Sequence, residues 1–396
     1  MSDSFSYDLC VVGGCGRVGL PLAIAFSSKG LKVAVHDLDN KAVETVRSGK
    51  MPFQEEGADP LLAAAIENQL LDVANNPDMI RAARAVIVVI GTPVDEHLNP
   101  MFSTLSKLFE QLSAHMCDGQ LLVLRSTLYP GTTDKIARFL LGRGLQVKVS
   151  FCPERIAEGR AIEELEKLPQ IVSGHSPEAR EEARKLFSHL TSDVVELEPF
   201  EAELAKLFTN SWRYIQFATA NQFYMMAQAY HADFYKIYDA MRFKYPRTEG
   251  FPRAGFVAGP CLFKDTMQLA SFNNNNFFLG HAAMLINEGL PNFIVNQLKS
   301  QLPLDKCVVG ILGMAFKGDI DDGRDSLSYK PKKILHFEAK KVLCSDPYVK
   351  EPDLVGLEEL NRQCDVVVLG APHKCYQNVK FEPHIKVVDV WNFWRN

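Results

Sequence analysis

Residues 7–19 read YDLCVVGGCGRVG, and this stretch decides the fold. Its first half is a short apolar run, which predicts a β-strand. Its second half carries glycines in the spacing Gly14-x-Gly16-x-x-Gly19. An apolar helix is predicted to follow over residues 20–28, and a second strand over residues 31–35 ends close to Asp37. A strand, a glycine turn, a helix and a strand with an acidic residue at its end form the fingerprint of a dinucleotide-binding βαβ unit.

Each position of this fingerprint has a physical role. Gly14 makes the tight turn, Gly16 lets the backbone approach a pyrophosphate, and Gly19 lets the helix pack closely on the strand. The helix N-terminus favours the phosphate charge, whereas a purely structural glycine turn would need neither this helix nor Asp37. The Asp37 carboxylate can accept both ribose hydroxyl hydrogens and would repel a 2′-phosphate, so NAD is favoured over NADP. The cofactor-binding residues expected here are Gly14, Gly16, Arg17, Val18, Gly19 and Asp37.

Strands alternate with helical patterns along much of the remaining chain, which predicts parallel, doubly wound sheets. The strand-like runs lie at residues 7–12, 31–35, 85–90, 121–124, 147–151, 307–312, 341–344, 365–369 and 386–390. Residues 200–230 read as one helix without a strong breaker, and helices of that length often join two domains. We therefore expect an α/β protein with two Rossmann-like doubly wound domains, joined by a long helix and a central helical region. The expected domains are residues 1–195, 196–300 and 301–396.

The composition excludes several classes of function. With 47% hydrophobic and 23% charged residues, the chain has the composition of a soluble globular protein. A net charge of −5 argues against general nucleic-acid or anionic-membrane binding, which needs a basic face. No apolar run approaches the ~20 residues that span a bilayer, and the first residues lack the pattern of a signal peptide. We expect a cytoplasmic protein without a nucleic-acid or membrane partner.

Nine cysteines are scattered along the chain, and none forms a CxxC pair. This argues against a zinc site or a disulfide framework, so no metal is expected. Cys10, Cys307 and Cys344 lie in apolar, strand-like runs and are predicted to be small buried hydrophobic residues. Cys15 lies inside the glycine loop and is not a candidate nucleophile.

Residues 259–266 read GPCLFKDT and carry the second chemical signal. Cys261 lies two residues after a glycine, with Lys264 and Asp265 just beyond it. A thiolate is a strong nucleophile, a nearby cation can activate it, and a carboxylate can transfer a proton or position a water. A nucleophilic thiol in a chain that also binds a hydride acceptor predicts oxidation past the aldehyde to an acid, through a thioester.

Polar residues also follow three of the predicted strands, where ligands bind in such sheets. They are Gly91-Thr92-Pro93, Ser126-Thr127 and Cys152-Pro153-Glu154-Arg155. A capping hydroxyl is an equal interpretation of Thr127, and a surface ion pair is the alternative for Glu154 and Arg155. Lys206 and Asn210 are spaced to share one face of the long helix and could stabilise an oxyanion or orient a water. Taken alone, their spacing is more typical of a solvated helix face, and the Cys261 motif is what favours a catalytic role.

In this order the motifs resemble those of the UDP-glucose/GDP-mannose dehydrogenase family over essentially the whole chain. The matching motifs are Gly14-x-Gly16-x-x-Gly19, Gly91-Thr92-Pro93, Ser126-Thr127, Pro153-Glu154, Lys206-x-x-x-Asn210, Gly259-x-Cys261-x-x-Lys264-Asp265 and Phe316-Lys317…Asp322-x-Arg324-x-Ser326. The resemblance implies an N-terminal NAD domain, a central dimerising region and a C-terminal domain that helps to bind a nucleotide diphosphate. It implies NAD as the cofactor, a nucleotide-sugar substrate and a homodimer. The implied reaction is a four-electron oxidation of the C6 alcohol to a carboxylate, with two NAD and one water consumed.

The resemblance also implies a role for individual residues. Cys261 would form the thiohemiacetal and then the thioester, and Glu154 would be the base for thioester hydrolysis. The residues that stabilise the oxyanion and manage the water would be Lys206, Asn210 and Asp265, with Thr127 assisting. The cofactor site would add Thr92, Pro93, Ser126, Thr127 and Lys317. The substrate site would comprise Glu154, Arg155, Lys206, Asn210, Gly259, Lys264, Phe316, Lys317 and Arg324.

The loop before Cys261 departs from the family pattern, which leaves the sugar open. Relatives carry several glycines there, whereas this chain reads GFVAGP over residues 255–260, which makes a bulkier wall. Lys264-Asp265 resembles the UDP-glucose and GDP-mannose branches. Residues 153–155 and 210–213 resemble instead enzymes that act on UDP-N-acetylhexosamines. The UDP-sugar classes stay about equal, with GDP-mannose behind them.

Two other functions compete with this one. A β-hydroxyacid-type dehydrogenase would make one hydride transfer without a thiol, and the Cys261 motif and the second α/β unit argue against it. A non-catalytic nucleotide-sugar-binding homologue would lack some of the polar residues expected at the site, and all of them are present here.

Overall fold

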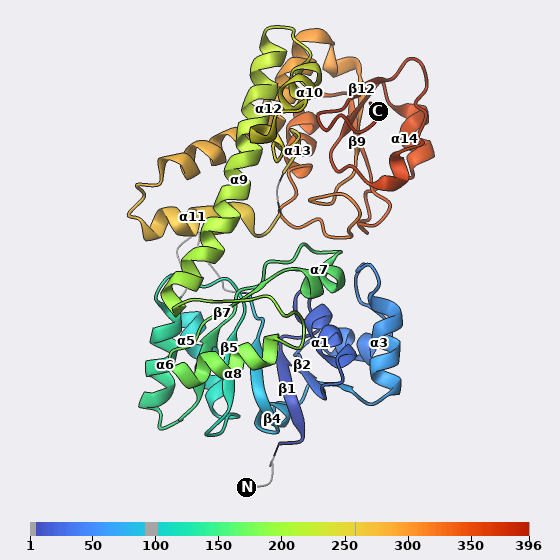
Figure 1. Ribbon diagram of the computed structural model, residues 1–396. Helices are drawn as coiled ribbons and strands as arrows, with labels where there is room; N and C mark the ends of the chain where they lie inside the picture. Colours follow the sequence, from blue (N-terminus) through green and yellow to red (C-terminus); the bar gives the residue numbers. More distant parts are fainter. Residues whose placement is uncertain (1–4, 92–101, 258, 396) are drawn as a thin grey trace. The chain divides into compact units, whose positions relative to one another are not determined.

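The computed structural model describes residues 5–91, 102–257 and 259–395. The chain divides into two compact units, Met1–Phe208 and Thr209–Asn396, each with its own parallel sheet (Figure 1). The predicted α/β fold is therefore confirmed. The division falls within the long helix α9 (Pro199–Ala229), which was also predicted. The finer division of the chain at residues 195 and 300 stays a prediction.

The described residues of the first unit form a six-stranded parallel sheet in the order β3-β2-β1-β4-β5-β6. Its strands are β1 (Tyr7–Val12), β2 (Val33–His36), β3 (Leu71–Ala74), β4 (Ala83–Val88), β5 (Leu121–Leu124) and β6 (Lys148–Phe151). The strand order reverses between β1 and β4, so a crevice that can hold a ligand is expected at the carboxyl ends of these strands. Five of the strands match the predicted runs, and β3 was missed because Asp72 interrupts its short apolar pattern.

Helices cover both faces of this sheet, and Figure 1 shows α1, α3, α5 and α6 around its strands. Leu9 and Val11 belong to the hydrophobic core beneath α1, α3, α7 and α8, whereas Cys10 and Val12 belong to the core beneath α4, α5 and α6. Successive residues of a strand point to opposite faces, so a sheet buried on both sides reads as a continuous apolar run. The helices are α1 (Gly19–Ser28), α2 (Asn40–Arg47), α3 (Ala58–Glu67), α4 (Asp78–Arg81), α5 (Phe102–Ser113), α6 (Thr132–Gly142), α7 (Ala161–Lys167) and α8 (Pro177–Phe187). A separate pair of parallel strands consists of β7 (Gln170–Val172) and β8 (Val194–Glu196).

The described residues of the second unit form a four-stranded parallel sheet in the order β10-β9-β11-β12. Its strands are β9 (Val308–Leu312), β10 (Lys341–Ser345), β11 (Val366–Leu369) and β12 (Lys386–Val388), all of which match predicted runs. One face packs against α12 and α13 and the other against α14. The helices are α10 (Phe234–Arg242), α11 (Leu262–Phe272), α12 (Phe278–Gln301), α13 (Tyr329–Glu338) and α14 (Leu357–Gln363), with short 3₁₀ turns at Pro246–Thr248, Leu304–Lys306 and Lys374–Tyr376.

One cysteine prediction was wrong. Cys10 and Cys344 are buried as predicted, whereas Cys307 is only partly buried. Cys307 lies just before β9 rather than within it, and its thiol donates to the Pro303 carbonyl over 3.3 Å. The apolar run on which the prediction rested therefore begins one residue before the buried strand.

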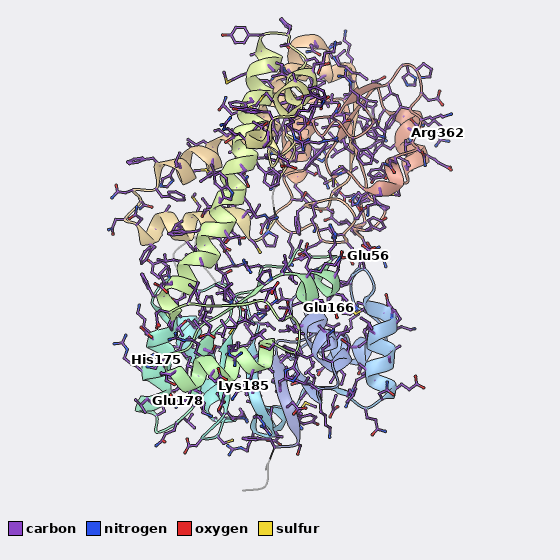
Figure 2. All side chains as sticks on the ribbon, viewed as in Figure 1. Glu56, Glu166, His175, Glu178, Lys185 and Arg362 are labelled. Carbon is purple, nitrogen blue, oxygen red and sulfur yellow. The ribbon has the colours of Figure 1, made fainter. Side chains whose placement is uncertain are left out.

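Charged side chains lie on the outward faces of the covering helices, for example Glu166 on α7 and Glu178 and Lys185 on α8 (Figure 2). The Lys29 ammonium lies 2.6 Å from the Glu166 carboxylate, an exposed ion pair of the kind that contributes at most ~1 kcal/mol. Within the described residues, none of the helices is both long and apolar enough to span a membrane.

Candidate active site

The glycine loop joins β1 to α1 and is shaped by contacts that exclude side chains. Gly13 has a φ of 73°, which favours glycine. A Cβ on Gly14 would lie 2.8 Å from the Val11 carbonyl oxygen, and one on Gly19 would lie 2.6 Å from the Gly14 Cα. A Cβ on Gly16 would meet nothing closer than 3.7 Å, so the loop is open at this position. Glycines are needed for packing at two positions, and the third leaves room for a ligand against the backbone.

Asp37 follows β2 and is held beside this loop. Its Oδ2 accepts from the Cys15 N–H over 2.9 Å, and its Oδ1 accepts from the Asp39 N–H over 3.0 Å. A carboxylate offers about four acceptor sites, so it can also accept from ribose hydroxyls. Burial, followed by the charges of Asp37 and Asp39, raises the pKa of the Cys15 thiol to about 12, so this thiol stays protonated at neutral pH. The loop and Asp37 fit NAD.

The remaining predicted cofactor residues have different surroundings. Arg17 lies over the Phe53 ring, with 5.0 Å between its guanidinium carbon and the ring centroid. Val18 is the residue that precedes α1. Ser126 donates from its hydroxyl to the Ile90 carbonyl over 2.6 Å, which ties the end of β5 to the end of β4. Thr127 is half-buried, and Thr92 and Pro93 lie outside the described residues.

Glu154 pairs with Arg125, which the sequence analysis missed. The Arg125 guanidinium donates to the Glu154 carboxylate through both Nε (2.9 Å) and Nη2, and both side chains are buried. The alternative of a surface ion pair between Glu154 and Arg155 does not hold, because Glu154 is buried and the Arg155 guanidinium donates to the Pro169 carbonyl. Arg125 can be recognised in the sequence as a charged residue at the end of the wholly apolar run that forms β5.

Lys206 on α9 belongs to the same group of contacts. Its ammonium donates to the backbone carbonyl of Glu154, and Lys206 itself is half-buried. The structure therefore brings together two of the predicted motifs of the first unit, one after β6 and one on α9. The solvated-face interpretation of Lys206 does not hold.

In the second unit, Cys261 is exposed and directly precedes α11. The N-terminal end of a helix favours negative charge, as on a thiolate. Asp265 lies one turn further on, is fully buried, and its N–H donates to the Cys261 carbonyl over 2.8 Å. The Asn210 amide donates to Asp265 Oδ2 over 2.6 Å. Lys264 is half-buried on the same turn. Three predicted catalytic residues therefore lie in one cluster.

The loop before Cys261 contacts the predicted nucleotide-binding motif. Gly259 has a φ of 107°, and its N–H donates to the Asp325 carbonyl over 3.3 Å. A Cβ on Gly259 would lie 2.6 Å from the Phe316 ring. The Arg324 guanidinium pairs with the Asp322 carboxylate over 2.6 Å, and its side chain is largely exposed. Lys317, between these residues, is half-buried.

Asn221, a second residue that the sequence analysis missed, holds the start of this loop. Its amide accepts from the Gly255 N–H over 2.8 Å and donates to the Gly255 carbonyl over 3.2 Å. It also donates to the Asn287 side chain over 2.9 Å, and both amides are fully buried. A Cβ on Gly255 would lie 2.3 Å from the Trp391 ring. The loop before Cys261 has fewer glycines than in relatives and was expected to form a bulkier wall. The Asn221 amide holds the first residue of this loop, Gly255, in place.

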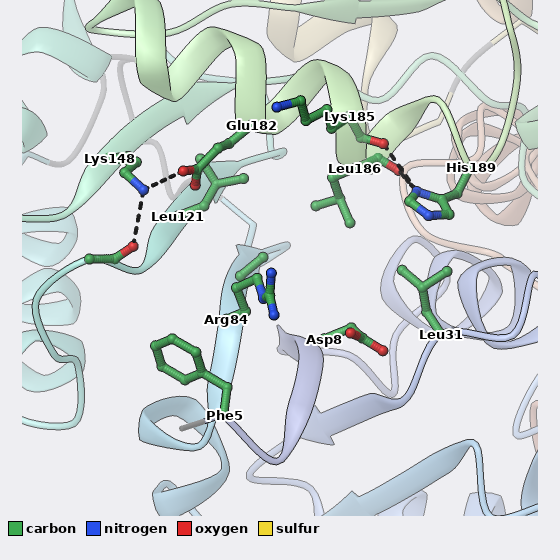
Figure 3. Close-up of a pocket in the computed structure, with 12 residues that line it drawn as sticks. Phe5, Asp8, Leu31, Arg84, Leu121, Lys148, Glu182, Lys185, Leu186 and His189 are labelled. Carbon is green, nitrogen blue, oxygen red and sulfur yellow. Dashed lines mark hydrogen bonds and ion pairs between the residues drawn. The ribbon is translucent and has the colours of Figure 1, made fainter. Parts of the chain in front are cut away.

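A separate cavity of about 510 Å³ lies in the first unit, at the amino ends of β1, β4, β5 and β6 (Figure 3). Lys148 and Glu182 pair at its wall, and Asp8 and Arg84 also line it. Ligands of such sheets bind at the carboxyl ends of the strands, so this cavity is not part of the candidate active site. Among the residues that the structure describes, no group of three or more metal-ligating side chains is present.

Three domain models of one family match the chain. They are the NAD binding domain of the UDP-glucose/GDP-mannose dehydrogenase family over residues 8–191, its central domain over 200–288 and its UDP binding domain over 310–396. The chain belongs to this family. The resemblance expected from the motifs is therefore confirmed, and NAD is its cofactor. A β-hydroxyacid-type dehydrogenase is not supported.

Relatives of the chain come from both archaea and bacteria. The UDP-N-acetyl-D-mannosamine dehydrogenase of Pyrococcus horikoshii is 30% identical over 380 residues, which covers 93% of this chain and 90% of that protein. A solved structure of UDP-D-ManNAc dehydrogenase from the same organism superimposes with a TM-score of 0.87, at 29% identity, and covers 94% of this chain and 91% of that one. A UDP-glucose dehydrogenase from Pyrobaculum islandicum shares the fold with a TM-score of 0.89 at 24% identity, covering 100% of this chain and 97% of that one.

Proposed function

We propose that this protein is an NAD-dependent UDP-sugar 6-dehydrogenase that converts the C6 alcohol to a carboxylate through a thioester on Cys261. The observation that carries this proposal is the cluster of an exposed Cys261 with the buried Asn210–Asp265 pair, at the start of α11. The family's NAD binding and UDP binding domains in the same chain supply the other two requirements. Residues 1–195, 196–300 and 301–396 are proposed as the cofactor, central and nucleotide-sugar domains.

Each step of the proposed oxidation is assigned to particular residues of the chain. NAD, when bound at the glycine loop, would supply the hydride acceptor for each of the two oxidations. After the first oxidation the Cys261 thiolate attacks the aldehyde carbon, which gives a thiohemiacetal oxyanion. Lys206 and the Asn210 amide stabilise this oxyanion, with Thr127 assisting, because donors aimed at a developing charge stabilise the transition state. The second oxidation gives the thioester, which one water cleaves to the carboxylate and the free thiol.

Asp265 and Glu154 are assigned to the hydrolytic step. Asp265 is buried one turn from Cys261, where it can position the water or take its proton. Glu154 is proposed as the base for hydrolysis, and its carboxylate already accepts from Arg125. The sugar nucleotide is assigned to Arg155, Gly259, Lys264, Phe316, Lys317 and Arg324.

UDP-N-acetyl-D-mannosamine is the substrate that we propose first. Relatives of that name, among them the Pyrococcus horikoshii protein at 30% identity, cover nine tenths or more of this chain. The Pro153-Glu154-Arg155 motif, which resembles enzymes acting on UDP-N-acetylhexosamines, agrees with that choice. Ranking by kcat/KM is the test, with UDP-N-acetylmannosamine, UDP-N-acetylglucosamine, UDP-glucose and GDP-mannose as substrates and NADH formation as the readout. A higher kcat/KM for any other sugar would overturn the assignment of the hexose, while NADH formation from any of them would still support the reaction.

We also propose a homodimer that forms through α9. Besides Phe200, five large apolar side chains are exposed along or just after this helix: Phe208, Trp212, Phe223, Met226 and Tyr230. At about 100° per residue they fall within about 60° of one another, so they form a single stripe. Exposed apolar stripes of this kind mark protein–protein contacts. A Trp212→Asp, Met226→Asp variant is expected to elute as a monomer in size exclusion with light scattering, and an unchanged mass would contradict the proposed interface.

A further inference from the structure

Arg125 is the one strongly charged side chain among the largest fully buried side chains of the described residues. It directly follows β5 and retains only 1% of its surface exposed. Its guanidinium stacks on the Phe187 ring, with 4.6 Å between the guanidinium carbon and the ring centroid. A buried arginine is strongly unfavourable unless its donors are matched, so its partners show what it is there to hold.

The partners of Arg125 are the predicted base itself and residues on either side of it along the chain. Nη1 donates to the Cys152 carbonyl over 3.1 Å, Nη2 to the Gln170 side chain over 3.1 Å, and Nε to Glu154 Oε2 over 2.9 Å. The planar guanidinium fixes the orientation of the groups that it binds, which a lysine ammonium could not do. One side chain thereby ties the end of β6 to the end of β5.

The other oxygen of the Glu154 carboxylate fixes the backbone of the same turn. Oε1 accepts from the N–H groups of Arg155 (2.7 Å) and Ile156 (3.0 Å). With both carboxylate oxygens held, the peptide carbonyl of Glu154 has a defined direction. That carbonyl accepts the hydrogen bond from the Lys206 ammonium. The contacts therefore run without a break from Arg125 through Glu154 to Lys206.

We propose that Arg125 is a positioning residue for the oxidation, which acts through Glu154 to fix the place of the Lys206 ammonium. The inference rests on the proposed function, which puts Lys206 at the oxyanion. Arg125 would not contact the substrate itself, and its effect on the rate would depend on Lys206. Because misplacement of a catalytic group by about 1 Å can cost about 100-fold in rate, loss of the guanidinium fork is expected to be visible in kcat.

Arg125→Lys is the first variant to test, because it keeps the positive charge and removes the planar guanidinium with its several donors. Its kcat for NADH formation is expected to fall roughly 10- to 100-fold, with the KM for NAD changed less than about twofold. The test of coupling repeats the substitution in a Lys206→Ala background, with single-turnover NADH formation as the readout. There Arg125→Lys is expected to lower the rate less than about twofold, since the group that it positions is gone. An equal fold-loss in both backgrounds would overturn the proposal.

Gln120→Ala is the matched control for damage to the fold alone. Gln120 is fully buried just before β5, at the opposite end from Arg125, and its amide donates to the Ile80 and Ala83 carbonyls over 2.7 Å each. Its replacement is expected to lower the melting temperature without changing kcat. If Gln120→Ala lowers kcat as much as Arg125→Lys at equal loss of melting temperature, the effect of Arg125 is structural and the proposal fails.

Glu154→Gln carries the same test if Arg125→Lys does not fold. This substitution weakens the Arg125–Glu154 pair by removing the carboxylate charge, and it keeps the size of the side chain. The second NADH, which forms before hydrolysis, is expected to appear roughly 10-fold more slowly than in the wild type and to lose this difference in the Lys206→Ala background. An unchanged rate of the second NADH would overturn the proposal. A wild-type protein that makes no NADH from any UDP-sugar would instead overturn the proposed function.

Discussion

Asn210 on α9 and Asp265 on α11 are joined by a 2.6 Å hydrogen bond from amide to carboxylate, and both side chains are buried. Asp265 lies one helical turn after Cys261, and the bond from Asn210 gives its buried carboxylate a fixed donor. A buried carboxylate with a fixed donor is suited to transfer a proton or to hold a water in one position.

Asp265→Asn is expected to fold and to lose about 100-fold or more in kcat for acid formation, because an amide can neither take a proton nor orient a water in the same way. Steady-state NADH formation measures this loss, and circular dichroism checks the fold. Asp239→Asn, an exposed carboxylate on α10, is the matched control and should keep full activity. Equal kcat values for the two variants would remove Asp265 from the mechanism.

Gly259→Ala is expected to destabilise the second unit by about 1–3 kcal/mol. Its φ of 107° is strained for alanine, and the new Cβ would lie 2.6 Å from the Phe316 ring. Denaturant unfolding measures the change in the free energy of unfolding. Adding Phe316→Ala should recover only the steric part. Gly250→Ala, where a Cβ meets nothing within 4 Å and φ is ordinary, should be neutral; an equal loss there would refute the explanation.

Asp37→Asn is expected to raise the KM for NAD about 10-fold and to leave kcat almost unchanged, since a charged acceptor of the ribose hydroxyls becomes a neutral one. The ratio of kcat/KM for NADP to that for NAD should rise, because the repulsion of a 2′-phosphate is lost. Asp39→Asn is the control, since Asp39 accepts from the N–H groups of Lys41 and Ala42 at the start of α2. A cofactor ratio that changes equally in both variants would show that the effect is local unfolding.

The lowered pKa of Asp346 predicts how the stability of the second unit changes in acid. Burial acts to raise its pKa, but hydrogen bonds from His373 and from the N–H groups of Val349 and Tyr348 outweigh burial and bring the pKa to about 2. A carboxyl whose folded pKa lies below its ordinary value of 3.8 stabilises the fold above that value and loses this contribution as the pH falls towards 2. The contribution at neutral pH is about 2 kcal/mol.

The free energy of unfolding of Asp346→Asn should therefore differ most from that of the wild type above about pH 5, and the difference should shrink between about pH 4 and pH 2. Urea unfolding across this range is the measurement. Asp305→Asn, an exposed residue of the same unit, is the control and should show little difference at any pH. A difference for Asp346→Asn that stays constant down to pH 3 would contradict the assignment.

Local patterns were sufficient to predict most strands of the two main sheets, but not β3 or the β7–β8 pair. The strands are buried on both faces and read as apolar runs, and the glycine loop has a spacing that its backbone requires. The long α9 was visible because no breaker interrupts residues 200–230. The short β3 was missed because Asp72 points away from the core and breaks its apolar run.

The partners of the site residues could not be predicted in the same way. Arg125 is held by Cys152, Glu154 and Gln170, which lie 27 to 45 residues away along the chain. Asn221 holds Gly255 across 34 residues. Such contacts depend on how the segments meet in space, and no periodicity of the sequence encodes them. Glu154 was therefore expected after a strand end, whereas its contact with Arg125 was not predicted.

The central claim is that Cys261 carries the sugar through a thioester, and the count of NADH per sugar tests it most directly. With a limiting UDP-sugar and excess NAD, we expect two NADH and one carboxylate for each sugar consumed. Cys261→Ser should bind NAD with unchanged affinity and form no net acid. One NADH per sugar in the wild type, or normal acid formation by Cys261→Ser, would contradict the mechanism.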